Sequence, residues 1–347
     1  MPTFRTAEVL EILAERPGLQ RVRVRVDVGD FEGEPGDKAY VLTDMVGHVT
    51  VGDRVVCNTT AVELGLGTGG WHVVHWNLSR TSFERRGPDH IMKLRYTSAQ
   101  FDAGTSEIEH PDIPISIDGT PVVVCSVHSQ VGVVAATVKA LGPDLRVSYV
   151  MTDGAALPLV ISDLVHDLRR TGCVDATVTA GHAFGGDLEA VHVASALTMA
   201  VHVQRADIVI VGMGPGVVGT GTELGTTAIE VASILDLVDA LGGVPVMCVR
   251  RSDGDRRERH RGVSHHSLTA ARLAHCQPWV AADPHGEAPL EGTRLHRVDT
   301  PPPDPAAVLD AVGIRITTMG RGPAEDPEFF AAAAAAANVA VDKVGTS

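Results

Sequence analysis

Hydrophobic and polar positions alternate strictly over residues 21–26, where the sequence reads RVRVRV. A period of two places one side of a β-strand in a core and the other in solvent. The apolar run 9–13 precedes it across the turn signal Pro17-Gly18, so we predict a hairpin rather than the alternative, a helix over residues 6–15. Strands at this spacing predict a small barrel or sandwich in residues 1–87. The further short strands are 39–43, 54–58 and 71–76.

The pattern changes after Pro121. Near-continuous apolar runs, typical of strands buried on both faces, alternate with stretches of helical periodicity. The predicted strand and helix pairs are 122–127 with 131–141, 146–151 with 159–170, 176–180 with 188–203, 208–211 with 226–241, and 244–249 with 264–274. Such alternation predicts right-handed βαβ units. Residues 121–322 are therefore a predicted α/β domain with a mostly parallel sheet and helices on both faces, preceded by the small β-barrel-like domain.

Turn residues and composition mark the other boundaries. Residues 88–120 are a connector rich in turn signals, and Pro301-Pro302-Pro303 marks a second break. Residues 323–347 contain a predicted helix at 328–339 with seven consecutive alanines, the residue of highest helix propensity. We interpret this C-terminal helix as structural.

Composition narrows the class of protein. The net charge is −14, whereas a protein that holds duplex nucleic acid over a broad face is normally basic. No apolar run approaches the roughly 20 residues needed to cross a bilayer, and the first residues lack the pattern of a signal peptide. Five scattered cysteines without CxxC spacing fit reduced thiols in the cytoplasm. We expect a cytoplasmic protein without a duplex nucleic-acid or membrane partner; a homo-oligomer is compatible with the sequence.

Polar segments follow the predicted strands of the α/β domain. Ligands of open parallel sheets bind beyond the carboxyl ends of the strands. We therefore expect these segments to converge at one edge of the sheet, with the functional site there. Asp187, within one of them, is interpreted as a helix cap. The segments are 128–130, 152–154, 181–187, 212–225 and 250–267.

Six glycines follow the fourth strand, in the sequence GMGPGVVGTGTELG over residues 212–225. Glycine lets a ligand approach the backbone, and N–H groups at a helix start can hold a phosphate. One G-x-G-x-x-G motif is present, but Pro215 removes a donor and the motif does not follow the first strand. Dinucleotide binding, a general anion site and pure turn geometry are the three alternatives. The candidate ligand-binding residues are Gly214, Gly216, Gly219, Thr220, Gly221 and Thr222.

Six arginines lie between Arg250 and Arg261. They form either a solvated loop, neutralised in part by acidic neighbours, or a clamp for an anion, since guanidinium groups pair with phosphate and carboxylate. For the clamp we select Arg251 and Arg257. At the next predicted helix start, Ser264 is the expected cap and the backbone of His265 the expected anion donor.

Four of the sixteen histidines follow predicted strands: His128, His182, His265 and His266. His128, His182 and His266 are candidates for proton transfer, because a neutral imidazole at a sheet edge or helix start can act as a base. For His128 and His182 the alternative is a buried ring that only forms hydrogen bonds. Zinc requires three or four ligands, and no i, i+4 or HxxEH spacing supplies them, so we assign no metal ligand and name no cofactor.

A second glycine cluster, LGLGTGGWH over residues 64–72, joins two predicted strands of the first domain. It is either a flexible hairpin connection or a lid that folds over the carboxyl edge of the sheet. The lid alternative makes Gly67 and Gly69 candidate ligand-binding residues.

Four stretches occur together: NTTAVELGLGTGGWH (58–72), GHAFGGDLEAVHVASAL (181–197), GMGPGVVGTGTELG (212–225) and RGVSHHSLTA (261–270). This set resembles the bacterial family of unknown function DUF3866. The resemblance covers approximately residues 5–320 and leaves the C-terminal helix outside. It implies that the β-rich start and the α/β body form one recurrent unit, and it implies no particular activity.

The residues favour one function and leave two alternatives. We expect a cytoplasmic α/β protein that binds an anionic, phosphorylated small molecule at the carboxyl edge of the sheet, with or without catalysis. The alternatives are a non-enzymatic regulatory or scaffold module and a metal-dependent hydrolase.

Overall fold

The computed structural model describes residues 2–28, 31–32, 36–66, 69–281, 296–298 and 303–345. The chain divides into two compact units, Met1–Gly104 and Thr105–Ser347, and each has a hydrophobic core of its own. Of the sequence predictions, those for Gly67 and Pro301-Pro302 lie outside the described residues.

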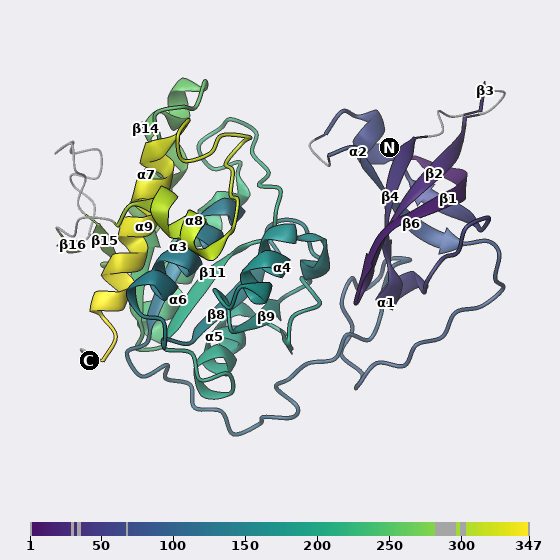
Figure 1. The fold of residues 1–347 in the computed structure, drawn as a ribbon. Helices are drawn as coiled ribbons and strands as arrows, with labels where there is room; N and C mark the ends of the chain where they lie inside the picture. Colours follow the sequence, from purple (N-terminus) through teal and green to yellow (C-terminus); the bar gives the residue numbers. More distant parts are fainter. Residues whose placement is uncertain are drawn as a thin grey trace. The chain divides into compact units, whose positions relative to one another are not determined.

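The first unit is a small closed β-barrel, as the sequence predicts (Figure 1). The strands follow one another in the order β1-β5-β6-β4-β2, and β2 pairs back with β1 to close the barrel. The pair β4 and β6 is parallel, and the other barrel pairs are antiparallel. The elements are β1 (Phe4–Arg16), β2 (Leu19–Val28), β3 (Phe31–Glu32), β4 (Asp37–Leu42), α1 (Thr43–Val46), β5 (Arg54–Asn58), α2 (Thr60–Glu63) and β6 (Trp71–Asn77).

The predicted hairpin at the start of the barrel is confirmed. β1 and β2 pair around Gly18, whose φ of +81° is a left-handed conformation that glycine adopts readily. The alternating valines of β2 all point into the core, because Val22, Val24 and Val26 are at most 3% exposed. The alternative helix over residues 6–15 is therefore excluded.

The second unit is a parallel sheet with helices on both faces, also as predicted (Figure 1). The order is β10-β9-β8-β11-β7-β12-β15-β16, and each neighbouring pair is parallel. The strands are β7 (Pro121–Cys125), β8 (Val147–Thr152), β9 (Ala176–Ala180), β10 (Leu188–Ala190), β11 (Ile208–Met213), β12 (Val244–Cys248), β15 (Trp279–Ala281) and β16 (His296–Val298).

Apolar helix faces cover the sheet on its two sides, in two separate clusters of buried residues. One face carries α3 (His128–Leu141), α4 (Asp163–Arg170), α8 (Pro305–Val312) and α9 (Pro327–Asp342). The other carries α5 (Val193–His202), α6 (Glu230–Ala240) and α7 (His265–Leu273). Short elements connect them: the 3-10 turns η1 (Leu159–Ile161), η2 (Thr227–Ile229) and η3 (Glu258–His260), and the hairpin of β13 (Arg251–Ser252) with β14 (Gly262–Val263).

Two local predictions are wrong. Residues 188–190 form β10 rather than the start of a helix, because they pair with β9 at the edge of the sheet. Asp187 does not cap the helix that follows; its carboxylate accepts a hydrogen bond from the backbone N–H of Thr177 at 2.8 Å. The cap of α5 is His192, whose side chain accepts from the N–H of Ala194.

The alanine-rich helix α9 is structural, as interpreted. Its alanines pack into the same core as α3, where Ala333, Ala334 and Ala337 are fully buried. Small side chains let two helices approach closely, so the alanine run suits this position. In the described part of the chain, no helix combines the length and the apolar character that a membrane crossing requires.

Candidate functional site

The carboxyl ends of five neighbouring strands lie at one edge of the sheet, because all of the strands are parallel. The chain leaves β7 through α3 on one face and leaves the adjacent β11 through α6 on the other. Ligand sites of open α/β sheets occur where neighbouring connections diverge in this way. The predicted segments after β7, β8, β9, β11 and β12 therefore converge at a topological switch point.

The glycine loop, residues 214–225 after β11, owes most of its glycines to its own geometry. A Cβ on Gly214 would lie 2.5 Å from the carbonyl oxygen of Ala156, and one on Gly225 would lie 2.2 Å from Thr220 Oγ1. Gly216 and Gly221 have φ values of +105° and +82°, which side chains disfavour. The glycine content by itself is therefore no sign of a ligand.

Gly219 is the exception, and it borders a group of histidines. A Cβ at Gly219 would meet nothing closer than 3.6 Å, and Cε1 of His266 would lie 4.0 Å away. A Cβ at Gly221 would lie 3.9 Å from the guanidinium group of Arg259. Glu223 pairs with Arg272 of α7. The glycine loop thus lies against the start of α7 and against η3.

The two threonines of the glycine loop close it on itself. The hydroxyls of Thr220 and Thr222 lie 2.8 Å apart, and Thr220 Oγ1 donates to the carbonyl of Gly225 at 3.1 Å. The backbone N–H of Thr220 donates to the same carbonyl at 2.8 Å. Both side chains are exposed, so their remaining lone pairs face solvent.

Three imidazole rings gather next to this loop, and we call them the histidine cluster: His260 of η3 with His265 and His266 of α7. Each offers a ring nitrogen, and these nitrogens lie within 4.8 Å of one another. His260 is 1% exposed and His266 is 6% exposed. His265 Nε2 and His266 Nδ1 are buried without a hydrogen-bond partner among the described residues.

Ser264 organises the histidine cluster. Its side chain caps α7, as predicted, by accepting from the backbone N–H of His266 at 3.3 Å. The same Oγ lies 2.8 Å from Nδ1 of His260. One hydroxyl thus fixes both the helix start and the orientation of a ring that arrives from η3.

The rings of the histidine cluster are neutral at pH 7. Burial lowers the pKa of His260 to about 3 and that of His266 to about 4. Burial is also the main cause of the lowered pKa of His265, followed by the positive charge of Arg259. Arg250 and Arg257 lower the pKa of all three rings further, which reports a positive potential at this edge.

The arginines selected for an anion clamp already have carboxylate partners. Arg251 pairs with Glu328 at 2.5 Å and Arg257 with Asp255 at 2.8 Å. Arg250 is buried and pairs with the same Asp255 at 3.3 Å. These charges are therefore partly offset within the protein.

Arg259, which the sequence analysis did not select, is different. Its side chain is exposed and forms no ion pair with a described residue. It lies beside Gly221 and contributes to the positive potential at His265 and His266. Within the glycine loop it is Gly221 that this arginine borders.

His128 is half-buried and hydrogen-bonded through both ring nitrogens, which is close to the alternative that the sequence left open. Its Nδ1 lies 3.1 Å from the carbonyl oxygen of Met213 and its Nε2 lies 2.7 Å from Ser162 Oγ. A carbonyl only accepts, so Nδ1–H donates to Met213 and Nε2 accepts from the serine hydroxyl. Burial lowers the pKa of His128 to about 4. Both nitrogens are occupied by protein groups.

His182 follows β9, where the predicted segment begins. Its backbone N–H donates to Asp153 Oδ2 at 3.1 Å. Asp153 follows β8, and its carboxylate fills the space beside Gly181 where a Cβ would come within 2.4 Å of Oδ2. Asp153 therefore joins the ends of two neighbouring strands.

Glu230, the first residue of α6, was missed by the sequence analysis. Thr152 Oγ1 donates to its carboxylate at 2.7 Å. Burial raises the pKa of Glu230 to about 7, and the charge of Asp153 adds to this. In the sequence it is an ordinary acidic residue at a helix start, and only the tertiary contacts reveal a carboxyl that titrates near neutrality. His260 was also missed, although three histidines in seven residues are a visible signal.

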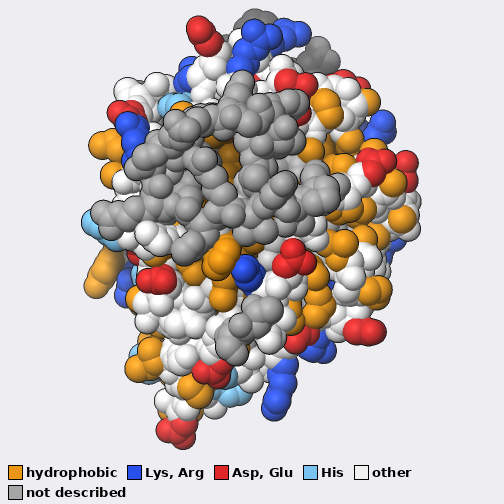
Figure 2. Space-filling view, turned by 90° about the vertical axis from the view of Figure 1, so that its left-hand side faces the viewer, with side chains coloured by type: hydrophobic (Ala, Val, Ile, Leu, Met, Phe, Trp, Pro, Cys, Tyr) orange, Lys and Arg blue, Asp and Glu red, His pale blue; other side chains and the backbone are white. Residues whose placement is uncertain are grey.

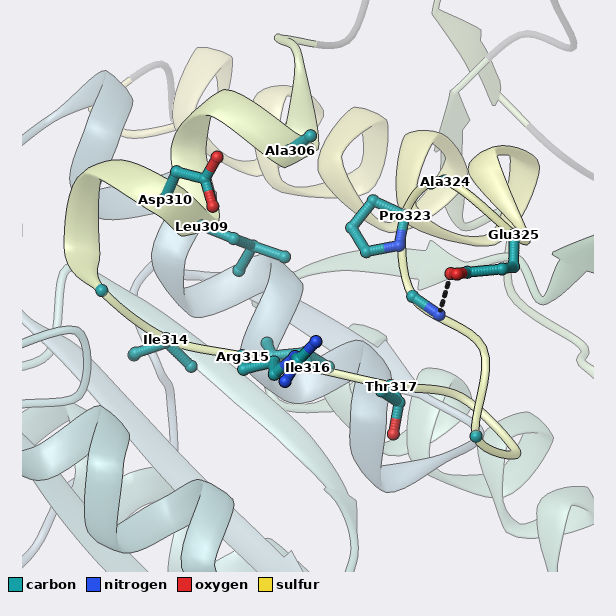
Figure 3. Close-up of a pocket in the computed structure, with 13 residues that line it drawn as sticks. Ala306, Leu309, Asp310, Ile314, Arg315, Ile316, Thr317, Pro323, Ala324 and Glu325 are labelled. Atoms are coloured by element: carbon teal, nitrogen blue, oxygen red, sulfur yellow. Dashed lines mark hydrogen bonds between the residues drawn. The ribbon is translucent and has the colours of Figure 1, made fainter.

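A cavity of about 780 Å³ is lined by none of the predicted site residues (Figure 3). Three successive stretches of the chain line it: α8, the segment 314–317 and the loop 320–325. Leu309, Ile314 and Ile316 supply apolar surface. On the opposite side Glu325 accepts a hydrogen bond from the N–H of Gly322 at 2.8 Å.

Gly69 belongs to the first unit, where it lies between α2 and β6 with a φ of +65°. The alternative in which the 64–72 loop is a lid stays a prediction.

The fold and the carboxyl edge of the sheet define the architectural class of this protein. It is an α/β protein with a closed β-barrel, a parallel sheet and a polar, glycine-rich topological switch point. The family model "Protein of unknown function (DUF3866)" matches residues 38–337, and the chain belongs to this family. The match begins at residue 38 and reaches into α9, so its extent differs at both ends from the resemblance over approximately residues 5–320. Neither the curated proteins nor the solved structures give a match.

Proposed function

We propose that this protein binds an anionic small molecule of the phosphorylated class between the glycine loop and the start of α7. The positive potential at this edge carries the proposal. Arg259 lies exposed beside Gly221, and together with Arg250 and Arg257 it lowers the pKa of neighbouring histidines. A chain of net charge −14 that concentrates positive charge at one place favours an anion there.

Two further features support an anion. The N-terminus of α7 carries the positive end of the helix dipole, which attracts phosphate and carboxylate groups. Basic side chains also gather at the top of the face shown in Figure 2, at the height of β14 in Figure 1. The arginine-rich segment 250–261 runs from β13 towards β14.

The geometry favours a general anion site over a dinucleotide site. Gly214, the first glycine of the G-x-G-x-x-G motif, lies close to the carbonyl of Ala156. The absence of a side chain therefore makes room for the protein's own backbone and not for a ligand. The loop also continues to η2 before α6 begins at Glu230, whereas a dinucleotide motif opens directly into a helix. His266 is the candidate for proton transfer if the bound molecule reacts, because its ring is neutral and borders Gly219.

A thermal-shift panel of inorganic phosphate, nucleotides and sugar phosphates tests the proposal. A ligand at one hundred times its Kd stabilises the native state by about 2.7 kcal/mol. We expect at least one phosphorylated compound to raise Tm and its unphosphorylated counterpart to have no effect.

Two variants and one control place the ligand. Arg259→Gln removes the exposed charge, and Gly219→Val fills the open space beside His266; both should abolish the shift while the proteins stay folded. The matched control is Arg205→Gln, an exposed arginine that precedes β11 and so belongs to the opposite edge of the sheet. No stabilising compound, or an equal shift in Arg259→Gln and Arg205→Gln, refutes the proposal.

A further inference from the structure

The histidine cluster has the composition of a metal site. Its three ring nitrogens lie within 4.8 Å of one another. In a tetrahedral zinc site with Zn–N bonds of about 2.0 Å, the nitrogens are about 3.3 Å apart. Small rotations of the side chains would therefore bring the nitrogens to one ion. We propose that His260, His265 and His266 bind a transition-metal ion of the Zn²⁺ type.

The unpartnered nitrogens are the second observation. A buried polar atom left without a partner destabilises the folded state, and here two occur in adjacent residues, His265 Nε2 and His266 Nδ1. The three imidazoles do not supply hydrogen bonds to these two nitrogens by themselves. A shared metal ion satisfies them, because a neutral imidazole nitrogen is a preferred zinc ligand.

Ser264 supplies the outer contact that metal-binding histidines usually have. Its Oγ lies 2.8 Å from His260 Nδ1 and already accepts the N–H of His266. A hydroxyl oxygen has a second lone pair, so it can also accept Nδ1–H of His260. That tautomer leaves Nε2 of His260 with the lone pair that a metal requires.

The charges around the histidine cluster affect which further ligand a bound metal ion would take. Arg250, Arg257 and Arg259 repel a cation, and Asp255 offsets this only in part because it pairs with two of them. The bound ion therefore favours an anionic or hydroxide ligand from outside.

An open coordination position follows from the donor set. Among the described residues the group contains three histidines and no carboxylate or thiolate. Sites with three protein ligands leave the fourth position to water or substrate, as catalytic zinc sites do. The glycine loop borders the histidine cluster through Gly219, where a Cβ would lie 4.0 Å from His266 Cε1. The metal site stands without the proposed anion, and the two sites would reinforce each other if both are occupied.

Metal binding is measured directly on the full-length chain. Protein stripped with a chelator is titrated with Zn²⁺ by calorimetry and with Co²⁺ by visible absorption, in buffer without phosphate. We expect one ion per chain and the intense visible bands of four-coordinate Co²⁺. Wild-type protein that binds neither ion overturns the proposal, whatever the variants do.

The variants locate the ion. His265→Gln is preferred, because His265 is less buried than the other two rings. It should weaken Zn²⁺ binding by at least about 100-fold, the upper end of the loss that removal of a mere outer contact causes, and circular dichroism checks its fold. The control is His166→Gln, an exposed histidine of α4, which should bind as wild type. Equal affinity in the two variants overturns the assignment to this cluster.

The metal and anion sites can fail separately. Loss of Zn²⁺ binding leaves the phosphate response of the metal-free protein to be measured by itself. Conversely, Arg259→Gln should abolish the phosphate response while Zn²⁺ still binds, since Arg259 is no ligand.

Discussion

Two histidines at the same edge of the sheet, the half-buried His128 and the buried His266, differ most clearly in their hydrogen-bond partners. Burial lowers the pKa of both rings to about 4. Both nitrogens of His128 have protein partners, in Met213 and Ser162. Nδ1 of His266 has none among the described residues. The pKa is thus the same for a ring with two hydrogen-bond partners and for one whose Nδ1 has none, and only the hydrogen-bond partners separate the two.

The difference follows from the elements around each ring. His128 starts α3 and lies between the end of β11 and the cap of α4, three elements of the packed body. The histidine cluster is built from η3 and the first turn of α7, where the neighbouring glycine loop is exposed. We expect the first ring to stabilise the fold and the second to serve a ligand.

The largest expected effect is that of His128→Ala. The substitution removes a half-buried ring and leaves the carbonyl of Met213 and the hydroxyl of Ser162 without this partner. We expect a loss of about 4 kcal/mol in the free energy of unfolding, measured by urea denaturation. His166→Ala on the surface of α4 is the control and should change it by less than about 0.5 kcal/mol. A loss below about 1 kcal/mol for His128→Ala would contradict the expectation that this ring stabilises the fold.

Glu230 extends the comparison to a carboxyl group, with an effect that depends on pH. Its pKa is raised from 4.5 to about 7, so the folded protein holds this proton more tightly than the unfolded chain. Stability from this group is full below pH 4.5 and is lost as pH rises to about 7. A shift of this size corresponds to up to about 3 kcal/mol.

Glu230→Gln isolates that contribution, since glutamine keeps an oxygen for the hydroxyl of Thr152. Relative to wild type, the variant should gain up to about 3 kcal/mol between pH 4.5 and pH 8. Urea denaturation of both proteins across this range measures the difference, in which the titration of Asp153 and other shared groups largely cancels. A difference independent of pH would contradict the assignment.

The smallest expected effect is that of His265→Gln without metal. Because His265 Nε2 has no partner, its removal should change the free energy of unfolding by less than about 0.5 kcal/mol. With Zn²⁺ present, only the wild type should gain stability, by mass action. A large loss in metal-free buffer would mean that the cluster serves the fold, as His128 does.

Local patterns were sufficient for most of the fold. The strands β5 and β9 have the bounds that their apolar runs predict, and the alternation of β2 gave the hairpin. β10 was missed because its pairing with β9 is a tertiary contact. The start of α3 was placed three residues late, since the strand ends earlier than its apolar run.

The candidate site was predicted in outline. Because the carboxyl ends of parallel strands share one edge, the glycine loop and the start of α7 were predicted to lie close together. In the structure Gly219 lies beside His266. The roles of single side chains could not be predicted in this way. Arg251 forms an ion pair with Glu328 of α9, a residue far away in the sequence. His260 belongs to the histidine cluster through a 3-10 turn, and no local sequence pattern predicts the path of that turn.

The anchoring of β13 has a consequence for synthesis. Ser252 donates its hydroxyl to Asp326, 74 positions later, and Arg321 pairs with both Asp326 and Asp255. A nascent chain emerging from the ribosome therefore exposes the arginines and histidines of this segment before their anchor has been translated. Most strands of the sheet precede this segment in the chain, so the positively charged edge should be among the last regions to reach its final structure.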